Sequence, residues 1–113
     1  MQEWDAWTRN KLVDFLVPMV FLRHDAMAEA AAKALKSCYD RHLYVGVAGW
    51  VLSPQLAVKQ IRDATTAGAT GVVLFSYHYL GPNSDAATCV KAEDLVSSVF
   101  CEEVALPVMP WKQ

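Results

Sequence analysis

Nearly continuous apolar runs alternate with amphipathic stretches along this chain. The apolar runs predict strands over residues 13–21, 43–50 and 71–77. A strand with one solvated face alternates apolar and polar residues, whereas an unbroken apolar run is typical of a strand covered on both faces, as in a parallel sheet. Helical periodicity predicts helices over residues 3–11, 26–39, 54–67 and 90–104. We therefore expect helices and strands to alternate along the whole chain.

Local signals set the expected ends of these elements. Ser53 is expected to cap the third helix, with Pro54 in its first turn and Gly68 just beyond its end. Asp25 is expected to cap the second helix in the same way. Pro18 cannot donate a hydrogen bond to a neighbouring strand, so it should lie at a strand end or at an irregular point. Small residues in the second strand allow the close approach of another backbone or of a ligand.

The connections determine how the strands pair. Strands joined through helices of about 14 residues must be parallel, with right-handed crossovers. Such a sheet has two edges, and here both are apolar and carry none of the charges that protect natural edge strands. The predicted fold is therefore α/β, a slice of a larger sheet or barrel, and a proline at Val73 is expected to abolish folding. A flavodoxin-like piece is disfavoured because the first strand lacks a glycine-rich phosphate-binding turn.

Composition excludes several classes of partner. Of 113 residues, 54% are apolar and 19% charged, a surplus of core for one short domain. Ten Lys and Arg against twelve Asp and Glu give a formal charge of −2 without a basic patch, so no nucleic-acid partner is expected. No apolar stretch approaches the ~20 residues that span a bilayer, so no membrane partner is expected. The acidic start is unlike a signal peptide, and localisation is left open.

Motifs for metals and cofactors are missing from the sequence. Cys38, Cys89 and Cys101 lack the spacing of a zinc site and are expected to be free packing residues. The three histidines lie in separate segments, so no metal site is predicted. Because there is no phosphate-binding glycine loop and no nucleophile motif, no cofactor is expected either.

Four segments taken together resemble the carboxyl-terminal third to half of the bacterial glycosyl-hydrolase-like TIM-barrel proteins, the family-10-like glycosyl hydrolases. They are Trp4-Asp5-Ala6-Trp7, the run from Leu12 to Phe21, Leu43-Tyr44-Val45-Gly46-Val47, and the run from Gly71 to Tyr77. The family has the patterns W-x-x-W, v-D-f-x-x-P-M-x-Y, v-y-x-G-x and G-x-x-x-F-S-Y in this order. Phe21 stands where the family more often has Tyr, which puts in doubt any role that needs a hydroxyl there.

The resemblance covers about residues 3–80 and implies strands six to eight of a (β/α)8 barrel. Residues 1–104 would then be the carboxyl-terminal portion of the barrel and residues 105–113 a tail. A complete barrel needs about 250 residues, so this chain would hold less than half of one. Trp4 and Trp7 are expected to form a helix face that packs against the barrel.

Glycoside hydrolysis normally uses two carboxylates, and barrel enzymes place catalytic groups at the carboxyl ends of their strands. None of the predicted strand ends carries a carboxylate. Asp14 opens its strand on the opposite side and is expected to be a cap or hydrogen-bond partner. The resemblance places the acids on earlier strands, so the isolated chain is expected to be inactive. The strand ends would instead contribute substrate-binding residues, with aromatic platforms beside polar groups: Trp50, Tyr77, Ser76, His78, Met19 and also Tyr79.

Two hypotheses about function follow. The first is the carboxyl-terminal part of a carbohydrate-active hydrolase, whose partners are a poly- or oligosaccharide and the missing amino-terminal half of the barrel. The alternative is a non-catalytic α/β module that completes its sheet by oligomerisation.

Overall fold

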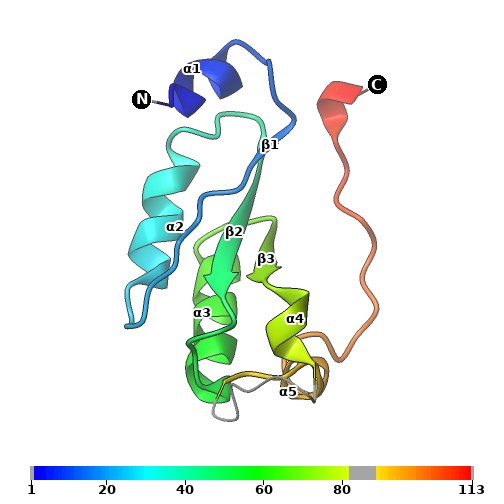
Figure 1. Cartoon of the computed structure of the whole chain (residues 1–113). Coiled ribbons are helices and arrows are strands. Elements are labelled where there is room, and N and C mark those ends of the chain that lie inside the picture. The colour runs from blue at the N-terminus through cyan, green and yellow to red at the C-terminus, as the bar shows by residue number, and fades with distance from the viewer. Residues whose placement is uncertain (1, 82–88, 113) are drawn as a thin grey trace.

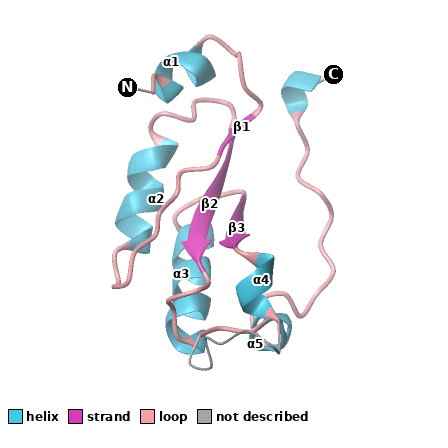
Figure 2. Cartoon of the chain, viewed as in Figure 1, coloured by secondary structure: helices cyan, strands magenta, loops and turns pink. Residues whose placement is uncertain are grey.

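Within the described residues, 2–81 and 89–112, the computed structural model has three parallel strands that alternate with helices (Figure 1). The strands are β1 (Phe15–Leu16), β2 (His42–Ala48) and β3 (Gly71–Phe75). The helices are α1 (Trp4–Arg9), α2 (Met27–Leu35), α3 (Pro54–Thr66), α4 (Tyr77–Leu80) and α5 (Ala92–Val96), followed by the 3-10 helix η1 (Pro110–Lys112). The predicted α/β class is confirmed, and Figure 2 shows that loops join α5 to η1.

The strands lie in the sheet in their chain order, β1-β2-β3. β2 is central and pairs with β3 over five positions, from Tyr44 opposite Gly71 to Ala48 opposite Phe75. The strand predicted over 13–21 is interrupted, and only its first part pairs regularly with β2. Pro18 lies at the interruption, as expected, and its carbonyl accepts a hydrogen bond of 2.9 Å from the Gly46 N–H.

One face of the sheet packs against α2 and α3. Leu43, Val45 and Val47 of β2 are fully buried on this face. Alternate residues of the neighbouring strands, such as Leu16 and Leu74, join the same core. The helices contribute small and medium side chains: Met27, Ala31, Ala34, Ala57, Ile61 and Ala64. Burial of these side chains provides the main driving force for folding.

The opposite face carries apolar side chains that stay partly exposed. Phe15 packs edge-on against Tyr44, with ring centroids 5.5 Å apart, and Phe21 packs in the same way against Phe75 at 5.2 Å. Even so, 47% of Phe15 and 51% of Met19 remain exposed. Contiguous exposed apolar side chains commonly mark an interaction surface. We call this surface the open sheet face; its apolar side chains are Phe15, Met19, Phe21, Tyr44, Val73 and Phe75.

Glycine at position 46 lets β2 approach the segment after β1. A Cβ atom on Gly46 would lie 3.1 Å from the Pro18 carbonyl oxygen and 3.3 Å from Met19 Cα. Because both neighbours are backbone atoms, Gly46→Ala is expected to lower the free energy of unfolding by about 1–3 kcal/mol in a urea titration. Gly81→Ala is the matched control, since the nearest atom that its Cβ would meet among the described residues is the His78 carbonyl oxygen at 3.9 Å. Equal effects of the two substitutions would contradict this account.

The signals at the ends of α3 are confirmed, whereas the cap predicted for α2 is wrong. Ser53 Oγ accepts a hydrogen bond of 3.3 Å from the Leu56 N–H, and Gly68 has φ of +106° beyond the end of α3. The second helix begins later than expected, so that Ala26 occupies its N-cap without a side-chain bond. Asp25 lies outside the helix and forms an ion pair of 2.8 Å with Lys59 instead.

Several other element boundaries differ from the prediction: α1 ends at Arg9, α2 at Leu35 and β2 at Ala48, each earlier than expected. The third strand ends at Phe75, because α4 begins at Tyr77. The last helix is far shorter than the predicted 90–104 and ends at Val96, where Ser97 and Ser98 follow. Both serine hydroxyls donate to carbonyls of the preceding turn, and such bonds compete with continuation of a helix. Most of the predicted loop over 80–89 lies outside the described residues.

The predicted tail is fixed at its far end by the amino-terminal ends of the strands. Trp111 Nε1–H donates to Asp14 Oδ1 over 2.9 Å, and Lys112 Nζ lies 2.6 Å from Asp14 Oδ2. The expected role of Asp14 as a hydrogen-bond partner on this side of the sheet is confirmed. Trp111 and Lys112 therefore bind the far end of this segment to the sheet.

Candidate functional site

Aromatic side chains converge where the strands end. Trp50 follows β2 and lies 4.8 Å from Phe21, which follows β1, with the two rings at 77°. The ring of Phe75, the last residue of β3, packs against the ring of Phe21. Tyr79 of α4 completes it, with its ring centroid 6.4 Å from that of Trp50. We call Phe21, Trp50, Phe75 and Tyr79 the aromatic cluster. Phe75 ends β3, and Trp50 follows β2, so the cluster lies at the carboxyl ends of these strands, which are drawn as arrowheads in Figure 1.

Local backbone contacts position the cluster. Gly49 allows β2 and β3 to meet here, since a Cβ atom would lie 3.0 Å from the Phe75 carbonyl oxygen. The Cys89 thiol donates to the Trp50 carbonyl over 3.0 Å and holds the loop after β2. The Phe75–Ser76 peptide bond, which is cis, leads into the first turn of α4. This turn brings Tyr79 back toward Trp50.

The predicted site residues differ in how exposed they are and in how close they lie to the aromatic cluster. Trp50 is half-buried within the aromatic cluster, and Ser76 is half-buried beside it in the chain. His78 is exposed, with its ring 5.1 Å from that of Tyr79. Tyr77 is 92% exposed, and none of the ring contacts among the described residues involves it. Met19 lies beside Gly46, farther back along the sheet.

Sequence reasoning missed two members of the cluster as candidates. The sequence predicts Phe75 only as a strand residue, and Phe21 only as a strand-end residue that departs from the family pattern. The signal that finds them is strand periodicity, because Phe75 lies two positions after Val73 and Phe21 two after Met19, on the open sheet face.

Carboxylates near this end of the sheet form ion pairs within the fold. Among the described residues directly after the strands, 17–25, 49–53 and 76–81, Asp25 is the sole acid. Its partner Lys59 also contacts Asp63 over 2.7 Å. Hydrogen bonds to Asp25 and Asp63 raise the pKa of Lys59. The cluster is therefore an apolar and aromatic surface with hydroxyl and imidazole groups at its margin.

The described residues include no cluster of metal-ligating side chains. Cys38 is buried, as expected, and burial raises the pKa of its thiol. Cys101 is exposed in the segment after α5, so the expectation that all three cysteines pack in the interior is wrong for this residue. Cys101 lies beyond the end of the short last helix. In the predicted helix over 90–104 it would have lain on the buried face.

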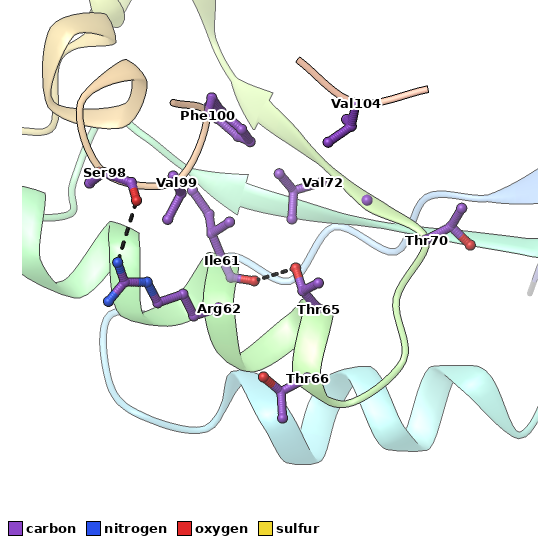
Figure 3. A pocket seen from close by; sticks show the side chains of 11 residues that line it. Ile61, Arg62, Thr65, Thr66, Thr70, Val72, Ser98, Val99, Phe100 and Val104 are labelled. Carbon is purple, nitrogen blue, oxygen red and sulfur yellow. Dashed lines mark hydrogen bonds between the residues drawn. The ribbon is translucent and has the colours of Figure 1, made fainter. Parts of the chain in front are cut away.

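Two open grooves flank the sheet. The first, of about 540 Å³, runs beside β3 and α3, and Phe100 and Val104 form its outer wall (Figure 3). The second, of about 490 Å³, runs beside β1 and is lined by Trp4, Trp7 and Met19 among others. Neither groove includes the aromatic cluster. Both lie along free edges of the sheet, and the cluster lies at the ends of its strands.

Comparison with known proteins gives no relative for this chain: no protein-family model, curated protein or solved structure matches it. The site is therefore interpreted from its own chemistry. No helix in the described part of the chain has the length and apolar character to cross a membrane.

Proposed function

We propose that this chain supplies a carbohydrate-binding wall of a (β/α)8 glycoside-hydrolase barrel, with the catalytic carboxylates on other strands. The observation that carries the proposal is the aromatic cluster at the carboxyl ends of parallel strands, the edge at which barrel enzymes bind their substrates. Two of its four members, Phe21 and Phe75, lie in the segments that resemble the glycosyl-hydrolase-like family.

The topology supports a barrel segment. The strands follow one another in chain order, and α2 and α3 both belong to the core on one face of the sheet. A barrel wall has this arrangement, with helices outside and side chains of the other face filling the interior. A doubly wound sheet would reverse its strand order and carry helices on both faces. In this proposal the open sheet face belongs to the barrel interior.

The chemistry of the strand ends suits a sugar ring. Sugars present apolar C–H faces ringed by hydroxyl groups, so an aromatic face beside hydrogen-bonding groups binds them well. Trp50 offers such a face, and its indole also has an N–H donor. The exposed Tyr77 hydroxyl and the His78 imidazole add polar groups nearby. Met19, farther from the cluster, would contact only an extended substrate.

Trp50→Ala is expected to weaken oligosaccharide binding about tenfold or more, because it removes the central aromatic face. The measurement is an NMR titration of the chain with soluble β-linked and α-linked oligosaccharides. Trp7→Ala is the matched control, because Trp7 is a partly exposed tryptophan on α1, away from the strand ends. Unchanged binding by the Trp50 variant, or an equal loss in the Trp7 variant, would contradict the proposal. Hydrolysis of a glycan by this chain alone would contradict the placement of the acids on other strands.

A second candidate, a non-catalytic module that completes its sheet with another copy, is favoured by the open sheet face. Phe15 and Met19 stay about half exposed there. The two candidates differ in ligand: a self-associating module binds no sugar, and Trp50→Ala would then change its association without any carbohydrate effect.

A further inference from the structure

The chain after α5 is bound to the rest of the molecule only near its ends. Residues 101–108 are all exposed, and none of the hydrogen bonds among the described residues involves 101–107. In Figure 1 this segment runs apart from the sheet toward the amino-terminal ends of the strands. We call residues 101–112 the strap. Segments with few buried contacts open at a small cost in free energy, well below that of global unfolding.

The far end of the strap is held by a compact group of contacts. Trp111 and Lys112 together occupy both carboxylate oxygens of Asp14. The Arg41 guanidinium lies over the Trp111 ring, 4.5 Å from its centroid, and His42 packs edge-on against the same ring. We call the contacts of Asp14, Arg41 and His42 with the strap the latch. Charged hydrogen bonds and a cation–π contact dominate it.

His42 also fixes the strap by one backbone contact, since its Nε2–H donates to the Val108 carbonyl over 3.0 Å. The side chain of Arg41 is only 4% exposed, and its Nε and Nη1 atoms have no hydrogen-bond partner among the described residues. The closed strap therefore covers a guanidinium that water would otherwise solvate. Burial of a charge in this way has a cost, which the latch contacts must offset.

We propose that residues 101–112 are a hinged strap that opens as a unit at the Asp14 latch while the sheet and its helices stay folded. Opening moves Val104 away from the outer wall of the groove beside β3 (Figure 3). It also exposes Arg41 at the amino-terminal end of β2, because Trp111 leaves the guanidinium. The core of β2, α2 and α3 contains no strap residue, so it does not depend on the closed position. This device is independent of the carbohydrate proposal.

The charge of Asp14 controls the latch. The charged and titratable groups that face it are Lys112 from η1, Arg41 from the turn before β2 and His42 at the start of β2. Hydrogen bonds from Lys112 and then Trp111 hold the pKa of Asp14 below its ordinary value of 3.8. Its contribution to closure is thus complete well above pH 3.8 and is lost as the pH falls through the lower closed-state pKa.

The test follows the Trp111 indole N–H by NMR in the full chain. Asp14→Asn is expected to speed exchange of this proton about tenfold or more, because a charged hydrogen bond is lost, while the amides of β2 keep their protection. Asp40→Asn is the matched control: its carboxylate lies 3.5 Å from Arg41 Nη1 but, among the described residues, forms no bond with the strap. The Trp111 signal is assigned by its absence in Trp111→Phe.

Unchanged exchange in Asp14→Asn would overturn the proposal, as would an equal acceleration in Asp40→Asn. If Asp14→Asn fails to fold, an acid titration of the unsubstituted chain decides the question. The strap is then expected to lose Trp111 protection at a higher pH than β2 loses its amide protection. Simultaneous loss would mean that the strap unfolds only with the core, and the proposal would be rejected.

Discussion

Replacing Leu43 by alanine is expected to lower the free energy of unfolding by about 2–5 kcal/mol, the range for a fully buried leucine. Leu43 is 0% exposed in the central strand and faces α2 and α3, so that its loss leaves a cavity at the centre of the core. Total stabilities of small domains are about 5–15 kcal/mol, and a change of this size leaves a marginal fold.

Urea unfolding followed by far-ultraviolet circular dichroism measures this effect. Leu12→Ala is the matched control, because Leu12 is 70% exposed and its truncation should change stability by less than about 0.5 kcal/mol. Similar effects at the two leucines would mean that the face of β2 toward the helices does not form the core.

Val73→Pro is expected to cost about 3 kcal/mol or more, whereas Leu74→Pro is expected to cost little beyond its lost side-chain contacts. The Gly46 N–H donates to the Pro18 carbonyl over 2.9 Å, so the bonding groups of Gly46 face β1 and those of Val45, next to it in β2, face β3. Because Val45 lies opposite Val72, the Val73 N–H points to the Val45 carbonyl, and the N–H groups of Val72 and Leu74 point to the free edge. Thermal unfolding of both variants, compared with the unsubstituted chain, measures the difference.

This register gives a physical reason for the sequence-based expectation that proline at Val73 abolishes folding. Because β3 has only β2 beside it among the described residues, the lost bond belongs to the one ladder that holds this strand. In the proposed barrel an additional strand would bond to the Leu74 N–H, so Leu74→Pro should block association at this edge. Equal destabilisation by the two prolines would contradict the register.

The amino-acid pattern was most informative where side-chain burial decides the structure. The runs around Val45 and Val73 form strands, and the Ser53 and Gly68 signals mark the ends of α3. Local signals failed where tertiary contacts compete with them. Asp25 has a cap residue's chemistry but bonds to Lys59, 34 positions away.

The candidate site was predicted in part. Trp50 was found because a large aromatic residue follows a strand, and it lies in the aromatic cluster. The sequence predicts Tyr77 as a second candidate because the third strand is expected to extend to residue 77. In the structure α4 begins at Tyr77, and its side chain is exposed to solvent. The contact of Trp111 with Asp14 spans 97 positions, and no local pattern indicates such a pairing.

The central claim is that the open sheet face and the free edge of β3 are surfaces that other strands cover, either of a barrel or of a second copy. Sedimentation velocity over a range of concentrations, with thermal melting of the same samples, tests it most directly. The account predicts a mass that rises above the 12.5 kDa of one chain as concentration increases, and weaker association for Leu74→Pro. A 12.5 kDa monomer at all concentrations, with a sharp cooperative melting transition, would contradict it.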